Sequence, residues 1–272
     1  MTIIHSLKLV KFQGSSEERE CGCSSISLIG RHPKAAEAFI EKRLLRIVAP
    51  LMLDSNVSVQ HAAVGALRNI SLIRPDICDH MVEQVSINHI NFVGNTVFKC
   101  VPFQDVMTSL ITLLKKLITT DWQPSKQTKS NKIDSKCEIF IEAVNLLWNL
   151  CEANDTALKC LHDVNLICGI MKHANIDIYG YRVVCPVLQC IYTASEDCKE
   201  PLLNSLLQQE YFIASLRLRP GESHEDLHIQ LLAQGIMLNL TASKGESVEP
   251  LLPEVITSIS KVLNQDHRAL VS

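Results

Sequence analysis

The chain has 272 residues, of which 47% are apolar and 20% charged, and its formal net charge is −3. This composition excludes a disordered tail, because it supplies enough apolar surface for an extended core. Charges of both signs are interspersed, so no basic stripe is present and direct nucleic-acid binding is disfavoured. Aromatic residues are scarce at 5%, which favours helices packed on helices over strands. The sequence therefore predicts an all-α protein.

Residues 1–13 are predicted to be an unstructured leader. They lack the basic region, apolar region and cleavage site of a secretory signal, and the chain has no uncharged apolar run of 18 residues. We therefore expect no membrane partner, and a location in the cytoplasm and nucleus. The eleven Cys are an odd number and lie mostly in apolar helical runs, as expected for buried free thiols in a reducing compartment. Examples are Cys151, Cys160, Cys168, Cys185 and Cys190.

One short helical pattern recurs along the chain. Its copies read GCSSISLI, AVGALRNI, AVNLLWNL, CPVLQCIY and AQGIMLNL and occupy residues 22–29, 63–70, 143–150, 185–192 and 233–240. Equivalent positions are separated by 41, 80, 42 and 48 residues, and three of these gaps lie close to the ~40–47-residue period of armadillo and HEAT units. A polar break and a second amphipathic stretch follow each copy, which indicates helix–turn–helix units.

These units predict an armadillo/HEAT-type α-solenoid over residues 14–272, with about four to five repeats and forming part of a longer solenoid. The helices that carry the repeated pattern should line one concave side, because equivalent helices stack in register. No strands are expected.

Two segments interrupt the repeats. Residues 121–137 form a polar, Lys/Ser-rich stretch that we predict to be a flexible loop. Residues 85–104 fit no repeat, and their ends, Val-Ser and Pro-Phe-Gln, read like translated splice sites. We interpret this insertion as a retained intron, with residues 1–13 and the last two residues as further intronic readthrough. A genuine surface-loop insertion is the alternative.

Three Asn residues occupy the same place in their copies: Asn69, Asn149 and Asn239. An amide offers a donor and an acceptor, so these side chains could pair with the backbone of an extended peptide partner. Alternatively, they could bridge neighbouring repeats or satisfy local backbone groups. Trp148 is a further candidate contact residue, although a single Trp at helical spacing is more often partly buried packing.

Importin-type repeats place a Trp four residues before this Asn. In this chain those positions are Gly65, Asn145 and Gly235. The aromatic ladder is therefore missing, and a groove for nuclear-localisation signals is not expected.

No catalytic residue, cofactor site or metal site is predicted. Cys21 and Cys23 lack a second pair of ligands at a suitable spacing. The cluster His224, Glu225 and Asp226 follows Pro-Gly and is interpreted as a solvated helix start. A hydrolase with a Cys/His site assembled across helices remains the alternative from another functional class.

The repeats also show a specific family resemblance. The stretches that carry it most clearly are VQHAAVGALRNIS (59–71), ICDHMV (77–82), DVMTSLITLLKK (105–116) and EAVNLLWNLCE (142–152). They resemble the family of HEAT-repeat-containing protein 3, the animal relatives of fungal symportin. With SSEERECGC near the start and QLLAQGIMLNL near the end, the resemblance covers most of residues 14–266 except the insertion.

The resemblance implies a non-enzymatic protein-binding scaffold. The family is similar to a chaperone and import adaptor that delivers newly made ribosomal proteins of the 5S RNA particle to the nucleus with an importin. The basic N-terminal tail and the acidic cargo loop of the family have no counterpart here, since the polar loop carries Lys126, Lys129, Lys132 and Lys136. A generic armadillo scaffold with a different partner is the alternative.

Overall fold

The computed structural model describes residues 14–32, 35, 38–39, 44–72, 75–82, 105–120, 122, 134–161, 163–196 and 224–242. The described residues form helices and contain no strand, as predicted. The chain divides into two compact units, the first made of Met1–Leu117 and Glu138–Ala157 and the second of Ile118–Cys137 and Leu158–Ser272. Each unit is described separately below.

The helices follow one another in a simple order. In chain order they begin with α2 (Ser16–Gly30), α4 (Leu44–Val48), the 3₁₀ helix η1 (Ala49–Leu53), α5 (Val57–Ser71), α6 (Pro75–Val82), α7 (Val106–Thr119) and α8 (Ser135–Ala153). They continue with α9 (Asp155–Cys160), α10 (Val164–Met171), α11 (Ile176–Tyr179), α12 (Tyr181–Glu196) and α15 (His224–Ala242). The five copies of the repeated pattern lie in α2, α5, α8, α12 and α15, which confirms the helical interpretation of each copy.

Short polar side chains fix where several helices begin. Ser15 and Glu18 form a reciprocal capping box at the start of α2, with the Ser15 amide donating to Glu18 Oε2 at 2.7 Å. Asn56 caps α5 by accepting from two backbone amides, and Asp163 does the same for α10. These contacts satisfy donors that have no partner inside the helix. The helix starts therefore follow from local sequence.

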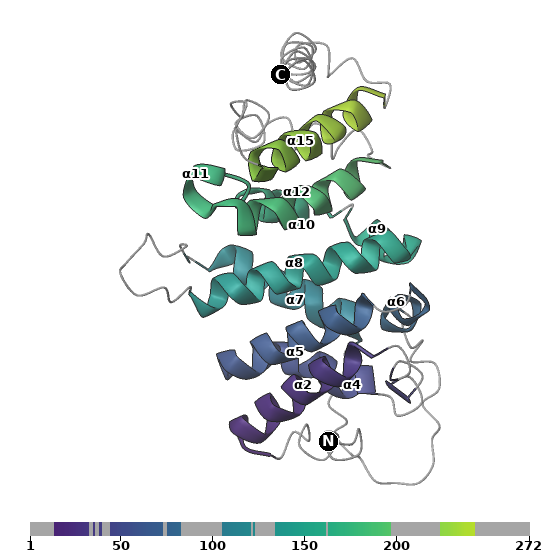
Figure 1. The fold of residues 1–272 in the computed structure, drawn as a ribbon, viewed down its shortest axis with the longest axis vertical. Helices are drawn as coiled ribbons and strands as arrows, with labels where there is room; N and C mark the ends of the chain where they lie inside the picture. Colours follow the sequence, from purple (N-terminus) through teal and green to yellow (C-terminus); the bar gives the residue numbers. More distant parts are fainter. Residues whose placement is uncertain are drawn as a thin grey trace. The chain divides into compact units, whose positions relative to one another are not determined.

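Within the first unit, α2, α5 and α8 lie side by side (Figure 1). Residues spaced four apart on one face of α5 are fully buried, among them Val59, Ala63 and Leu67. Helices α2 and α5 approach closely because Gly30 has no side chain, and a Cβ there would lie 2.8 Å from Ile70 Cγ1. The apolar stripe predicted from sequence thus forms the core of this unit.

An ion pair joins the start of α2 to the turn before α5. The Arg19 guanidinium contacts both carboxylate oxygens of Asp54, at 2.9 and 3.2 Å, and both side chains are largely buried. Such a two-pronged arrangement fixes orientation better than a single contact does. The N-terminal end of α2 is held in place by this contact as well as by its cap.

In the second unit, α12 packs along α15. Gly180, with φ of 71°, separates α11 from α12 and adopts a left-handed conformation that Gly tolerates readily. Next to these helices, Trp122 stacks on His173, with ring centroids 4.6 Å apart and planes 3° from parallel. Tyr179 meets both rings edge-on. This aromatic cluster anchors Trp122 in the core, where it is 4% exposed.

The last residues of the predicted loop at residues 121–137 belong to α8 in the structure. Trp122 is buried, and α8 already begins at Ser135. Residues 123–133 lie outside the described residues, as do the predicted leader 1–13 and the whole insertion 85–104. The intron hypothesis therefore stays a prediction.

Candidate functional site

The candidate site of the first unit is the open side of α5 and α8, where both helices expose one stripe. On α5 the half-buried or exposed positions recur at helical spacing and include Gly65, Asn69 and Leu72, which is 60% exposed. On α8 the corresponding stripe includes Asn145 and Asn149. The repeated Asn thus lies on the accessible side of its helix in both repeats.

Each of these Asn residues contacts the preceding helix of the repeat series. Asn69 Nδ2 donates to Ser27 Oγ on α2 at 2.7 Å, and Asn149 Nδ2 donates to Ser71 Oγ on α5 at 2.9 Å. Ser71 is buried, and its own hydroxyl donates to the Arg68 carbonyl at 2.7 Å. The bridging interaction considered from sequence is therefore present, and it uses only one of the hydrogen-bonding groups of each amide.

The second unit repeats this arrangement. Asn239 Nδ2 on α15 donates to Ser195 Oγ on α12 at 3.0 Å, and the Ser195 hydroxyl donates to the Tyr192 carbonyl at 2.6 Å. Ser195 is 1% exposed, whereas Asn239 is half-buried. We refer to the pairs Asn69–Ser27, Asn149–Ser71 and Asn239–Ser195 as the amide–hydroxyl bridges.

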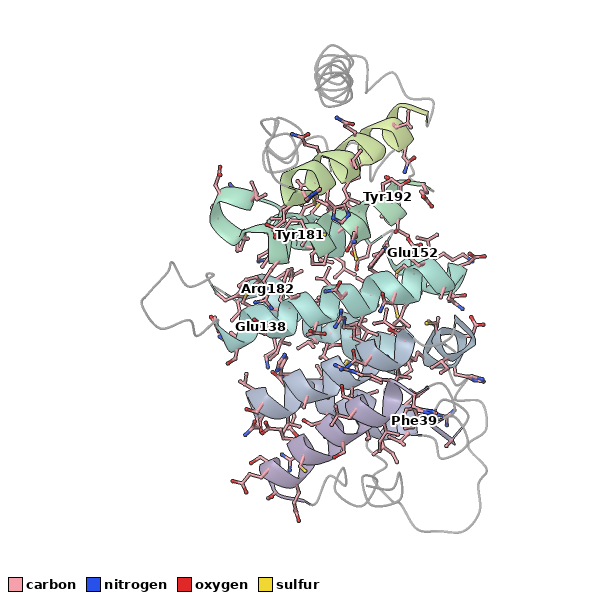
Figure 2. The ribbon with its side chains drawn as sticks, in the orientation of Figure 1. Phe39, Glu138, Glu152, Tyr181, Arg182 and Tyr192 are labelled. Atoms are coloured by element: carbon pink, nitrogen blue, oxygen red, sulfur yellow. The ribbon has the colours of Figure 1, made fainter. Side chains whose placement is uncertain are left out.

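Trp148 lies next to Asn149 on α8 and is half-buried. Its indole Nε1 donates to Glu152 Oε1 at 3.2 Å, an exposed contact one helical turn further along. The side chain is therefore neither fully exposed nor a core residue, and its ring is held in one orientation by Glu152. Figure 2 shows Glu152 near one end of α8 and Glu138 near the other.

The open side of α8 carries three carboxylates. Glu138, Glu142 and Glu152 share this side by helical spacing. Arg68 on α5 pairs with one of them, its Nη1 lying 3.4 Å from Glu142 Oε2. In the described residues, Arg68 Nε and Glu142 Oε2 are buried and have no hydrogen-bond partner.

Asn69, Asn149 and Asn239 form an aligned Asn column. The positions four residues before them, Gly65, Asn145 and Gly235, have different surroundings. A Cβ at Gly65 would meet nothing within 4 Å, whereas a Cβ at Gly235 would lie 2.4 Å from Tyr192 Cε2. Tyr192, labelled on α12 in Figure 2, thus packs its ring against the α15 backbone. Asn145 instead donates to the Ile141 carbonyl at 2.9 Å. None of the three positions supplies an aromatic surface for a peptide.

One Cys/His pair in the second unit bears on the hydrolase alternative. His228 Nδ1 on α15 lies 2.8 Å from Tyr181 Oη and 3.6 Å from Cys185 Sγ, both on α12. Burial raises the pKa of the Cys185 thiol, and burial with the contact to Cys185 raises the pKa of Tyr181 to about 12. An activated cysteine nucleophile needs a lowered thiol pKa and access for substrate. Cys185, at 7% exposure, has neither property.

His224, Glu225 and His228 also have the H-E-x-x-H spacing of a zinc-binding helix, which the interpretation as a plain helix start did not take into account. The structure does begin α15 at His224, with His224 and Glu225 exposed. In the part of the chain that the structure describes, no group of three His, Cys, Asp or Glu side chains could hold a metal ion. Among the residues that the structure describes, the motif therefore lacks the third ligand that a zinc site needs.

The described cysteines are free thiols. Six of the nine are buried, Cys160 and Cys168 are half-buried, and Cys21 is exposed. Burial, together with Asp54, raises the pKa of Cys23 to about 12. Among the described helices, none is long and apolar enough to cross a membrane.

Comparison with known proteins finds two similar repeat proteins. A human protein is 26% identical over 266 residues, which cover 94% of this chain and 36% of that protein, and a mouse protein is 26% identical over 256 residues. Both are HEAT repeat-containing protein 3. The chain is similar to this protein. It spans about a third of the length of these HEAT repeat-containing protein 3 relatives, and the resemblance predicted from sequence is confirmed. No family model matches the chain.

Solved structures confirm the fold class. Computationally designed armadillo repeat proteins for modular peptide recognition match with a TM-score of 0.67 over 96% of this chain and 91% of theirs, at 15% identity. Another designed armadillo repeat protein, in complex with the peptide (KR)4, matches with a TM-score of 0.59 over 95% of this chain and 99% of its own, at 13% identity. The chain is an all-α repeat protein of the armadillo/HEAT class, a fold that serves as a protein-binding scaffold.

Proposed function

We propose that the chain is a non-enzymatic carrier of newly made, basic ribosomal proteins of the 5S RNA particle, acting in the cytoplasm and nucleus. The observation that carries this proposal is its similarity to HEAT repeat-containing protein 3 over nearly its whole length. The family resemblance supplies the cargo class, and an importin is the expected further partner. Catalysis is not part of the proposal because Cys185 is buried and its thiol pKa is raised.

The side chains on the open side of α5 and α8 are consistent with the proposed binding of a basic cargo segment in extended conformation. Glu138, Glu142 and Glu152 share one side of α8, and Glu142 pairs with Arg68 of α5; we expect Lys and Arg side chains of a cargo to be attracted to this side. The amides of Asn69 and Asn149 keep an acceptor oxygen and a second N–H beyond their bridges. A similar fold holds an alternating Lys-Arg peptide.

A pull-down tests the proposal. The 272-residue chain should recover the ribosomal proteins of the 5S particle from a lysate, identified by mass spectrometry. Replacing Asn69, Asn149 and Asn239 together by Ala should reduce this recovery, because each lost hydrogen bond weakens binding by roughly two- to tenfold. A wild-type chain that recovers other basic proteins but none of these would contradict the proposed cargo and favour a generic scaffold.

The triple variant must be compared with the wild type at equal folded fraction. Because all three Asn residues also bridge helices, each replacement can lower the free energy of unfolding. Thermal melts of both chains set a temperature at which both are folded. Equal recovery by two folded chains would show that the amides take no part in cargo binding.

A further inference from the structure

The amide–hydroxyl bridges have a directionality that bears on how the Asn residues could bind a peptide. A serine hydroxyl has one hydrogen and two lone pairs. In Ser71 and in Ser195 that hydrogen is already donated to the carbonyl three residues earlier, at 2.7 and 2.6 Å. Each Oγ can therefore only accept a further hydrogen bond.

This constraint fixes which end of the amide faces the serine. Oxygen and nitrogen of an Asn side chain are assigned from their hydrogen-bonding partners. Because Ser71 Oγ and Ser195 Oγ can only accept, Nδ2 of Asn149 and of Asn239 must face them, at 2.9 and 3.0 Å. The amide oxygen Oδ1 and the second N–H then lie on the other side of the amide group.

Pairing with an extended backbone requires one acceptor and one donor on the same amide, which are the two groups that each bridge leaves over. Within the described residues, the structure gives Asn149 and Asn239 no hydrogen bond besides the bridge. Both amides are half-buried, whereas Ser71 and Ser195 are buried at 6% and 1% exposure. The serines lie behind the amides and out of reach of a partner.

We propose that Ser71 and Ser195 are positioning residues, which hold the amides of Asn149 and Asn239 in the one orientation that presents Oδ1 and an N–H to a bound peptide backbone. This inference rests on the proposed function, since it assigns the serines a role in the same binding site. An amide held in place loses less conformational entropy on binding, so the serine contributes to affinity without touching the partner.

A double-mutant cycle tests this role. The probe is a fluorescein-labelled (KR)4 peptide, and its Kd for the full chain is measured by fluorescence anisotropy for wild type, Ser71→Ala, Asn149→Ala and the double variant. Ser71→Ala should weaken binding by about three- to tenfold, because a free amide can rotate into unproductive orientations. In the Asn149→Ala background the same change should alter Kd less than about twofold.

Ser109→Ala is the matched control. Ser109 is also buried in the first unit, but its Oγ has no hydrogen-bond partner among the described residues. Removing this hydroxyl should leave the Kd unchanged. A second cycle with Ser195→Ala and Asn239→Ala, in the other unit, provides an independent test if a variant of the first pair does not fold.

The outcomes separate the two proposals. A Kd that is indifferent to Ser71→Ala and Ser195→Ala, or that worsens by the same factor with and without the Asn, would overturn the positioning role alone. Tighter binding after Ser→Ala would also overturn it, because the bridge would then be withholding the amide from the peptide. A wild-type chain that fails to bind the peptide overturns both the pairing of the Asn amides with a peptide backbone and the positioning role. Failure to recover ribosomal proteins in the pull-down overturns the proposed function.

Discussion

The contrast between Gly65 and Gly235 allows a sharp test of the repeat packing. The two glycines occupy the same place in their repeats, and Ala at either position should gain helix propensity worth ~1 kcal/mol. At Gly65 the new methyl group meets no atom within 4 Å. At Gly235 it would lie 2.4 Å from Tyr192 Cε2 and 2.9 Å from Cδ2, well inside contact distance.

The ring of Tyr192 must move to admit this methyl group, and overpacking of this kind costs ~1–3 kcal/mol. Gly65→Ala should therefore stabilise the chain by up to ~1 kcal/mol, whereas Gly235→Ala should be neutral or destabilising by up to ~2 kcal/mol. The two variants should differ in free energy of unfolding by ~1–3 kcal/mol.

Urea denaturation followed by circular dichroism measures this difference, and thermal melts should show Gly235→Ala several degrees below Gly65→Ala. In a Tyr192→Ala background the penalty at Gly235 should disappear, since the clashing ring is gone. If Gly235→Ala is as stable as Gly65→Ala in the otherwise unchanged chain, α12 and α15 do not approach as described.

Two further predictions concern titratable groups. Burial is the main cause that lowers the pKa of His173 from 6.5 to about 4. Between these pH values the unfolded chain therefore binds a proton that the folded chain does not. The free energy of unfolding should fall by ~1.4 kcal/mol for each unit by which the pH decreases in this range. His173→Phe, which keeps a ring beside Trp122, should reduce this slope between pH 6.5 and 4. If the urea midpoint changes by the same amount from pH 7 to pH 5 in the wild type and in the variant, the assignment to His173 is wrong. Cys21 is exposed whereas Cys23 is fully buried with its pKa raised to about 12, so a thiol reagent such as DTNB at mildly alkaline pH should label Cys21 quickly and Cys23 only on unfolding. Cys21→Ser should remove a fast-reacting thiol and Cys23→Ser should not, and the reverse result would refute the placement of these two side chains.

Helical periodicity predicted the repeating helices because the signal is local and recurs. The copies at residues 63–70 and 143–150 fall inside α5 and α8, and caps such as Asn56 sit where the helices begin. The accessible side of each helix also followed from the spacing of apolar residues. The sequence could not decide whether the Asn column bridges repeats or faces a partner, and the structure shows the bridge directly.

The serine partners escaped notice because they do not share one column. Relative to the aligned Asn column, Ser27 lies one residue before it in its own copy, Ser71 two residues after it and Ser195 four residues after it. Only the packing of neighbouring helices brings these hydroxyls to equivalent amides. His228 likewise contacts Tyr181 and Cys185, which lie more than forty positions before it in the sequence. Helical periodicity is a local signal and does not predict such contacts.

The burial of Trp122 was missed for a different reason. It lies at the edge of a strongly polar stretch, and its environment is set by His173 and Tyr179 from a later repeat. A composition window averages such a residue with its polar neighbours. The composition of the stretch therefore indicated neither the burial of Trp122 nor the start of α8 at Ser135.

The empty space above Gly65 gives the chain a natural attachment point for a reporter group. A Cβ placed there has no neighbouring atom within 4 Å, and the position lies on the same accessible stripe as Asn69. Because the chain already contains eleven Cys, a non-canonical amino acid with a bio-orthogonal handle is the suitable means of attachment. A dye at this position would respond to occupancy of the α5 surface by changing its emission, and would follow cargo loading in real time without altering any hydrogen bond or core contact described above.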